Sequence, residues 1–165
     1  MTQRVDLATV MDRMAVDAVV TGYAVAVDDG DWVAYRALFT RDGRADYTSA
    51  GGIEGPAGEV ADWLAETMRI FPVRQHLIVN RRVELEDLGG SPGDRAEVRA
   101  DFVNPMRLTD GTDGAGGPDL STAPNFVAGG RYTFELARTY EGWRLRKVTV
   151  HEKWRHLAPA GAPVS

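Results

Sequence analysis

The 165-residue chain contains no cysteine, which excludes disulfide bonds, thiolate metal sites and a cysteine nucleophile. It also has no apolar run long enough to cross a membrane, and Arg4, Asp6 and Asp12 interrupt the region where a secretory leader needs an unbroken apolar segment. Positive charge is not in excess, because 19 Lys and Arg stand against 24 Asp and Glu. A net charge of −5 does not provide the basic face that a nucleic acid requires. We therefore expect a cytoplasmic protein that binds neither membranes nor nucleic acids.

Histidine is scarce as well, with three in the whole chain. His151 and His156 are five residues apart near the end of a predicted strand, where alternation turns them to opposite faces. Because the metal-binding patterns HxH and HExxH are also absent, no metal and no cofactor are expected. His76 stands at the start of an apolar run, and imidazole is the side chain that titrates near neutral pH. His76 is thus the first candidate for proton transfer, with a satisfied core or interface histidine as the alternative.

Apolar residues in the first part of the chain recur at intervals of three and four, which is the spacing of an amphipathic helix. A long helix is predicted over residues 5–28. Asp31 is placed to cap a second helix over 32–38, and Gly55-Pro56 opens a third helix that stops at Pro72. A short strand, 44–49, is predicted between the second and third helices.

After Pro72 the period of the apolar residues changes to two, which predicts strands over 74–88, 95–108, 125–140 and 143–155. Helices followed by an antiparallel meander predict an α+β fold with the helices on one face of the sheet. We expect one domain over residues 1–157 and a flexible tail over 158–165. Segment 109–124, rich in Gly, Asp and Pro, is predicted to be a mobile loop, either a surface excursion or a lid over a pocket.

Several positions predict irregularities in the sheet. Gly129-Gly130 indicates a bulge or a close approach of the backbone. Apolar residues of the last strand stand at odd positions up to Leu145 and at even positions from Val148, which predicts a bulge near Arg146-Lys147 and a curved strand. A bent sheet of this kind can enclose a cavity. Arg138 shares the apolar face of its strand, so it is expected to pair with a carboxylate or to lie at the sheet rim.

Five short motifs resemble, in their order and spacing, the nuclear transport factor 2-like superfamily in its SnoaL-like (polyketide cyclase-like) branch. They lie at residues 26–32, 38–43, 75–77, 129–132 and 141–143. The resemblance covers roughly residues 5–155. It implies a cone-shaped α+β barrel, in which a strongly curved, mainly antiparallel sheet wraps around the N-terminal helices and a pocket opens at the wide end.

Within that superfamily the chain is similar to scytalone dehydratase, bile-acid dehydratase and hexachlorocyclohexane dehydrochlorinase. Their shared Asp–His pair falls on Asp28 and His76, and two tyrosines of the dehydratases fall on Tyr23 and Tyr47. The resemblance implies a cofactor-independent lyase of the dehydratase type, acting on a hydrophobic ring-bearing small molecule. An aspartate that binds one imidazole nitrogen raises the basicity of the other, and a tyrosine hydroxyl can donate to an oxygen that gains charge. His76 is then the base, Asp28 orients it, and Tyr23 and Tyr47 assist.

The expected substrate contacts are Asn104, Phe102, Tyr132 and Trp63. Asn104 falls where the two dehydratases have a second histidine or an aspartate, and an amide can hydrogen-bond but cannot act as a base. The alternative role is packing on the sheet face for Tyr47 and Tyr132, and core packing on the apolar stripe of the first helix for Tyr23. Trp154 is expected in the core or on the cavity wall.

Two other functions remain open on the same residues. One is a polyketide-type cyclase or isomerase, and the other is a non-catalytic module that binds a small molecule. The last-strand arginine of bile-acid dehydratase falls near Glu152 or Lys153, so recognition of bile acids is not expected. An exposed sheet face predicts a homo-oligomer, a dimer or a trimer.

Overall fold

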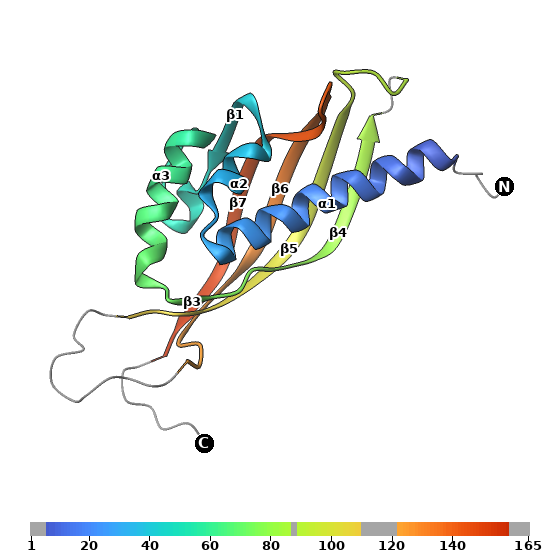
Figure 1. Ribbon diagram of the computed structural model, residues 1–165. Coiled ribbons are helices and arrows are strands. Elements are labelled where there is room, and N and C mark those ends of the chain that lie inside the picture. Colours follow the sequence, from blue (N-terminus) through green and yellow to red (C-terminus); the bar gives the residue numbers. More distant parts are fainter. Residues whose placement is uncertain (1–5, 87–88, 110–121, 159–165) are drawn as a thin grey trace, which may run out of the picture.

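The computed structural model describes residues 6–86, 89–109 and 122–158, and Figure 1 shows three helices lying against one face of a sheet. The predicted loop and tail, 109–124 and 158–165, fall outside the described residues except for a few flanking positions. The helical elements are α1 (Leu7–Asp29), α2 (Trp32–Ala37), η1 (Thr48–Ala50), α3 (Ala57–Thr67) and η2 (Met68–Ile70). The strands are β1 (Phe39–Asp46), β2 (Glu54–Pro56), β3 (Val73–Arg74), β4 (Leu77–Glu86), β5 (Arg95–Arg107), β6 (Phe126–Thr139) and β7 (Gly142–Leu157).

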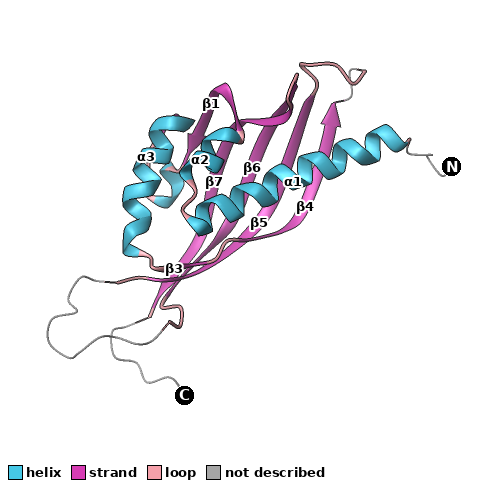
Figure 2. Cartoon of the chain, viewed as in Figure 1, coloured by secondary structure: helices cyan, strands magenta, loops and turns pink. Residues whose placement is uncertain are grey.

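The sheet has the order β2-β1-β7-β6-β5-β3, and β4 also pairs with β5. All pairings are antiparallel except that of β1 with β7. The sheet curves around α1 and stays open, with the helices inside the curve (Figure 2). This arrangement confirms the predicted α+β fold of a cone-like, mainly antiparallel sheet.

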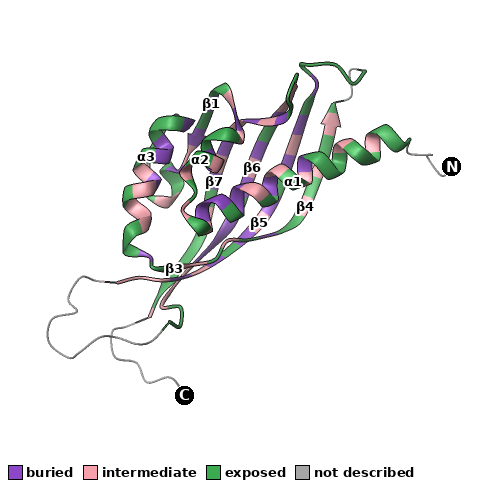
Figure 3. Cartoon of the chain, viewed as in Figure 1, coloured by how far each residue is buried: buried purple, intermediate pink, exposed green. Residues whose placement is uncertain are grey.

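Helix α1 provides the centre of the core. Asp6 caps its start, with a carboxylate that accepts from the N–H of Thr9 at 2.8 Å, and Gly30 ends it in the left-handed conformation. Its buried side packs toward the sheet, where Figure 3 shows matching buried bands on β5, β6 and β7. The first turns of the helix expose apolar side chains instead, including Leu7, Met11 and Met14.

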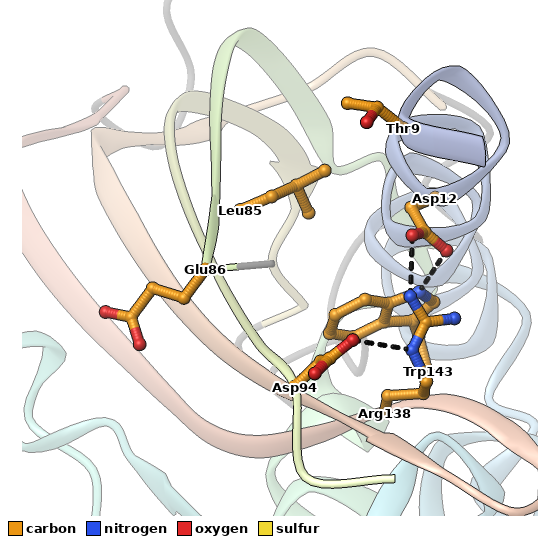
Figure 4. Close-up of a pocket in the computed structure, with 7 residues that line it drawn as sticks. All are labelled: Thr9, Asp12, Leu85, Glu86, Asp94, Arg138 and Trp143. Atoms are coloured by element: carbon orange, nitrogen blue, oxygen red, sulfur yellow. Dashed lines mark hydrogen bonds and ion pairs between the residues drawn. The ribbon is translucent and has the colours of Figure 1, made fainter. Parts of the chain in front are cut away.

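Arg138 anchors the N-terminal half of α1 to the sheet (Figure 4). Its guanidinium donates to Oδ2 of Asp12 at 2.6 Å and to Oδ2 of Asp94 at 3.2 Å, and it lies 4.7 Å from the ring centre of Trp143. The indole of Trp143 also donates to Asp12 at 3.2 Å. Hydrogen bonding to Arg138 lowers the pKa of Asp12 below its usual value. The expectation that Arg138 pairs with a carboxylate is confirmed, and the pairing joins segments more than 100 residues apart.

Two predicted boundaries before α3 are wrong. Strand β1 begins at Phe39, not at residue 44, because Phe39 is buried and pairs with Leu145 of β7. Gly43 permits the irregular register that follows, since a Cβ there would lie 2.8 Å from that of Phe39. The segment predicted to open the third helix forms β2, which pairs with β1, and α3 starts after Pro56.

The strand predicted over 74–88 is divided into β3 and β4, because the ladder with β5 is incomplete where Pro105, which has no N–H, stands opposite Gln75. The N–H of Gln75 donates to the carbonyl of Pro105 at 3.1 Å, whereas the N–H of His76 donates to the carboxylate of Asp28. The division therefore lies at the histidine that the sequence singles out.

Strand β7 carries two bulges. The predicted one near Arg146 is confirmed, since Glu135 pairs with Lys147 while Leu136 pairs with Leu145. The second falls at Lys153, because Gly129 pairs with Trp154 and Gly130 with Glu152. A Cβ on Gly129 would lie 2.3 Å from the Trp154 ring, so the glycine permits the close approach. Trp154 is 48% exposed, and its predicted place in the core or on the cavity wall is wrong.

Candidate active site

A cavity of about 360 Å³ lies between the C-terminal half of α1, the α3–η2 segment and strands β5 to β7. Its volume is in the range of sites that hold small organic ligands. Seven of the eight residues predicted for the site line it: Tyr23, Tyr47, Trp63, His76, Phe102, Asn104 and Tyr132. The eighth, Asp28, is not on the wall and lies against His76. The structure therefore brings together a set of residues spread over more than 100 positions.

His76 and Asp28 form a hydrogen-bonded pair. Nδ1 of the imidazole lies 2.6 Å from Oδ1 of Asp28, and the peptide N–H of His76 donates to Oδ1 and Oδ2 at 3.1 and 2.9 Å. The two side chains are 7% and 21% exposed. With Nδ1 held by the carboxylate, Nε2 is the ring nitrogen available to a ligand in the cavity.

Arg74 fixes the end of the helix that carries Asp28. Its guanidinium donates to the carbonyls of Val27 and Asp28 at 2.9 and 3.0 Å, and to that of Met68 at 3.0 Å. The last carbonyls of a helix lack partners within the helix and attract positive charge. Gly30 gives the guanidinium room, since a Cβ there would lie 2.8 Å from its Nη2 atom. Asp28 is therefore held by a contact to the segment that also carries His76.

The separation of Tyr23 and Asp28 also agrees with the helix geometry. Five residues correspond to about 140° of rotation, so the two side chains share a site only where the helix ends. Asp28 is the penultimate residue of α1, and it approaches the cavity from behind the imidazole. Tyr23, one and a half turns earlier, lines the cavity directly.

Four tyrosines gather at the inner end of the site. The hydroxyls of Tyr23 and Tyr47 are hydrogen-bonded, and that of Tyr35 lies 3.4 Å from Tyr47. Burial raises the pKa of Tyr23 and of Tyr47 well above the usual value, and burial raises the pKa of Tyr132 to about 12. These hydroxyls therefore remain protonated at neutral pH and can act as hydrogen-bond donors. Tyr35 lies in the predicted second helix, and sequence reasoning did not select it for the site.

The cavity mouth carries an ion pair that sequence reasoning missed. Arg155 donates to Oε1 of Glu152 at 2.6 Å and to the carbonyl of Ala50 at 3.0 Å, and both charged residues line the cavity. The bulge at Lys153 shifts the alternation of β7 by one residue, which turns Arg155 inward. The sequence signal for this inward turn was Gly129-Gly130. A bulge was expected there, but not the shift in alternation that it causes on the neighbouring strand β7.

The sequence pattern of the SnoaL-like domain matches residues 8–149. The chain belongs to the SnoaL-like domain family. This SnoaL-like protein is 27% identical over 139 residues to uncharacterized proteins of Mycobacterium bovis and Mycobacterium tuberculosis, and the match spans 84% of each chain. The predicted superfamily is thus confirmed.

Solved structures show the same fold. The hexachlorocyclohexane dehydrochlorinase LinA type 3 from Novosphingobium barchaimii gives a TM-score of 0.75 at 16% identity, covering 98% of this chain and 99% of the other. A candidate scytalone dehydratase from Novosphingobium aromaticivorans gives 0.69 at 15% identity, covering 94% and 97%. Within the described residues of the SnoaL-like protein, no helix is long and apolar enough to span a membrane.

Proposed function

We propose that this SnoaL-like protein is a cofactor-independent lyase that eliminates water from a hydrophobic ring-bearing molecule. The observation that carries the proposal is the Asp28–His76 pair, which lies behind an apolar cavity with protonated tyrosines at its inner end. The two structural neighbours named above, a dehydrochlorinase and a candidate scytalone dehydratase, are consistent with the proposal, and their likeness concerns the fold.

The residues assign the steps as follows. Nε2 of His76 takes a proton from the carbon next to a ring carbonyl, and the electron pair of that C–H bond delocalises onto the carbonyl oxygen as an enolate. The enolate then re-forms the carbonyl and a C=C bond to the next ring carbon, as the C–O bond of the hydroxyl on that carbon breaks. Asp28 stabilises the imidazolium through Nδ1. A hydroxyl of Tyr23 or Tyr47 donates to the enolate oxygen, and the imidazolium returns its proton to the departing hydroxide, which leaves as water.

A second candidate is an isomerase or cyclase that uses the same base. Asn104 favours it, because a neutral amide stands where related dehydratases carry a second titrating group. Isomerisation of a cyclic enone needs only one base that removes and returns a proton. The products separate the two candidates, since only elimination releases water.

The test uses 3-hydroxy-1-tetralone, a two-ring β-hydroxy ketone whose dehydration gives 1-naphthol, a product with its own absorbance and fluorescence. The wild type is expected to accelerate this reaction, and His76→Ala to reduce the rate by roughly 10²–10⁴-fold. Tyr140→Phe is the matched control, because Tyr140 is 96% exposed. Binding of the ketone without turnover in any variant would contradict the lyase proposal and leave a binding module.

We also propose that the protein acts as a homo-oligomer. Leu77, Val103 and Trp154 lie on the outer face of the sheet and are 38–48% exposed, with Leu77 directly opposite Val103. Apolar patches of this kind are commonly covered in assemblies. Sedimentation velocity of the wild type and of Trp154→Glu tests this: a wild-type monomer would contradict it.

A further inference from the structure

The guanidinium of Arg155 is held in place at the cavity mouth by three contacts. Its Nε atom donates to Oε1 of Glu152 at 2.6 Å, and its Nη2 atom donates to the carbonyl of Ala50 at 3.0 Å. The central carbon of the group lies 5.9 Å from the ring centre of Phe126. All four residues line the cavity. Arg155 is therefore fixed against the cavity wall, although its side chain is 48% exposed.

This ion pair keeps one donor group and one acceptor atom unused. Among the described residues, neither Nη1 of Arg155 nor Oε2 of Glu152 has a hydrogen-bond partner. The side chain of Glu152 is 12% exposed, and Oε2 is not one of the polar atoms that are closed off from the solvent. A guanidinium can only donate and a carboxylate can only accept. The pair therefore offers a donor and an acceptor side by side to a molecule in the cavity.

One row of residues across the sheet connects the pair with His76. The register of β3 and β4 on β5 sets His76 opposite Asn104. Asn104 pairs with Ala128 of β6, which in turn pairs with Arg155 of β7, and all four residues line the cavity. Neighbouring side chains in such a row are about 5 Å apart, so three steps place Arg155 roughly 15 Å from His76 along the sheet. Because the imidazole and the guanidinium occupy part of this span, two fused rings lying over the small Ala128 reach from one to the other.

We propose that Arg155 and Glu152 form a subsite for a hydroxyl group on a two-ring ligand, at the end remote from the carbon that His76 deprotonates. The position of that carbon rests on the proposed function, which the subsite deepens by naming the substrate class. The hydroxyl oxygen accepts from Arg155, and its hydrogen is donated to Glu152. An ether leaves the carboxylate unpaired. A carboxylate ligand is repelled by Glu152, whose charge already compensates that of Arg155.

The test measures the binding of three inert probes, so its outcome is separate from that of the lyase assay. The probes share two fused rings and differ in one substituent. In 2-naphthol it is a donor and an acceptor, in 2-methoxynaphthalene an acceptor alone, and in 2-naphthoate an anion. None of them carries a leaving group. Titration calorimetry at neutral pH gives the three dissociation constants for the wild type and for each variant.

The wild type is expected to bind 2-naphthol about tenfold more tightly than 2-methoxynaphthalene, which is the effect of one net hydrogen bond, and more tightly than 2-naphthoate. Arg155→Met should bind 2-naphthol and the ether alike. Glu152→Gln leaves the charge of Arg155 uncompensated, so 2-naphthoate should become its tightest ligand. The same substitutions in an exposed pair, Arg82→Met and Glu84→Gln, are the matched controls and should keep the wild-type order.

Three results would overturn the proposal: a wild type that does not prefer 2-naphthol, a naphthol preference that survives in Arg155→Met, or a Glu152→Gln variant that still binds 2-naphthoate more weakly than 2-naphthol. A purely structural role of the pair predicts a lower thermal midpoint in both variants with the order of the probes unchanged. Loss of turnover in His76→Ala together with unselective probe binding would support the lyase and reject the subsite. Selective binding without any turnover would support the subsite and reject the lyase.

Discussion

The carboxylate of Asp28 binds both the ring and the backbone of His76, a residue 48 positions away in the chain. The ring contact measures 2.6 Å, and the peptide N–H reaches both carboxylate oxygens. The carboxylate that orients the imidazole also accepts from the peptide N–H of His76, which points away from β5 at the edge of the sheet. The candidate catalytic pair therefore also fixes the backbone where β3 and β4 are separated.

Replacement of Asp28 by asparagine is expected to reduce turnover of the β-hydroxy ketone by at least 100-fold. An amide has one acceptor atom and cannot stabilise an imidazolium by charge. Asp29→Asn is the matched control, since Asp29 is the next residue and is exposed. Equal rates for the two variants would reject the role of Asp28.

Arg74→Met is expected to destabilise the protein by roughly 2–4 kcal/mol, because three carbonyl groups at the end of α1 and in η2 lose a charged donor. Because Asp28 then loses its support, turnover should fall as well. Urea unfolding and the ketone assay measure the two effects. Arg69→Met should change neither, since Arg69 is 76% exposed and pairs with the exposed Glu66.

The buried tyrosines predict a loss of stability in alkaline solution. The pKa of Tyr132 rises from 10.0 to about 12 on folding, so the unfolded chain releases the proton first as the pH increases. The protonated Tyr132 contributes about 3 kcal/mol to the free energy of unfolding. This contribution is complete below about pH 10 and is lost as the pH rises through about 12. Urea unfolding at stepped pH should show a smaller alkaline loss for Tyr132→Phe than for the exposed-site control Tyr140→Phe.

Arg138→Met is expected to destabilise the protein by about 3–5 kcal/mol, because Asp94 is 2% exposed and loses its only ion-pair partner among the described residues. The free energy of unfolding at acid pH gives a second measurement. The pKa of Asp12 is lowered by Arg138, so its contribution is present above about pH 4 and is lost as the pH falls through the lowered value. In Arg138→Met the free energy of unfolding should therefore fall less as the pH is lowered. Arg82→Met, which breaks an exposed pair with Glu84, should have little effect on either measurement.

Local pattern predicted most of the fold. The periodicity of three and four located α1 and α3, and alternation located β5, β6 and β7 to within a few residues. The bulge at Arg146 could be predicted because the apolar residues themselves change parity there. Strand β2 has only three residues, which is too short for an alternating pattern in the sequence. It is defined by its pairing with β1.

The candidate site was predictable as a set of residues, because the superfamily motifs lie on Asp28 and His76. Its geometry was not. The turn of Arg155 into the cavity depends on Trp154 packing over Gly129, which lies on another strand. Such effects arise between segments that are distant in sequence, where single-residue patterns carry no information. A cytoplasmic location remains a prediction from composition.

The pairing of Asp12 with Arg138 has a consequence for the order in which the protein folds. The two residues are 126 positions apart, so the first helix can dock in its final place only after the β6–β7 hairpin has been synthesised. Closing such a long loop loses chain entropy before the stabilising contact forms. Folding is therefore expected to be slow compared with helical proteins of this size. Until the last strands are made, the part of α1 that packs on β6, which includes Tyr23, has no partner, and the cavity that depends on it is among the last parts of the molecule to form.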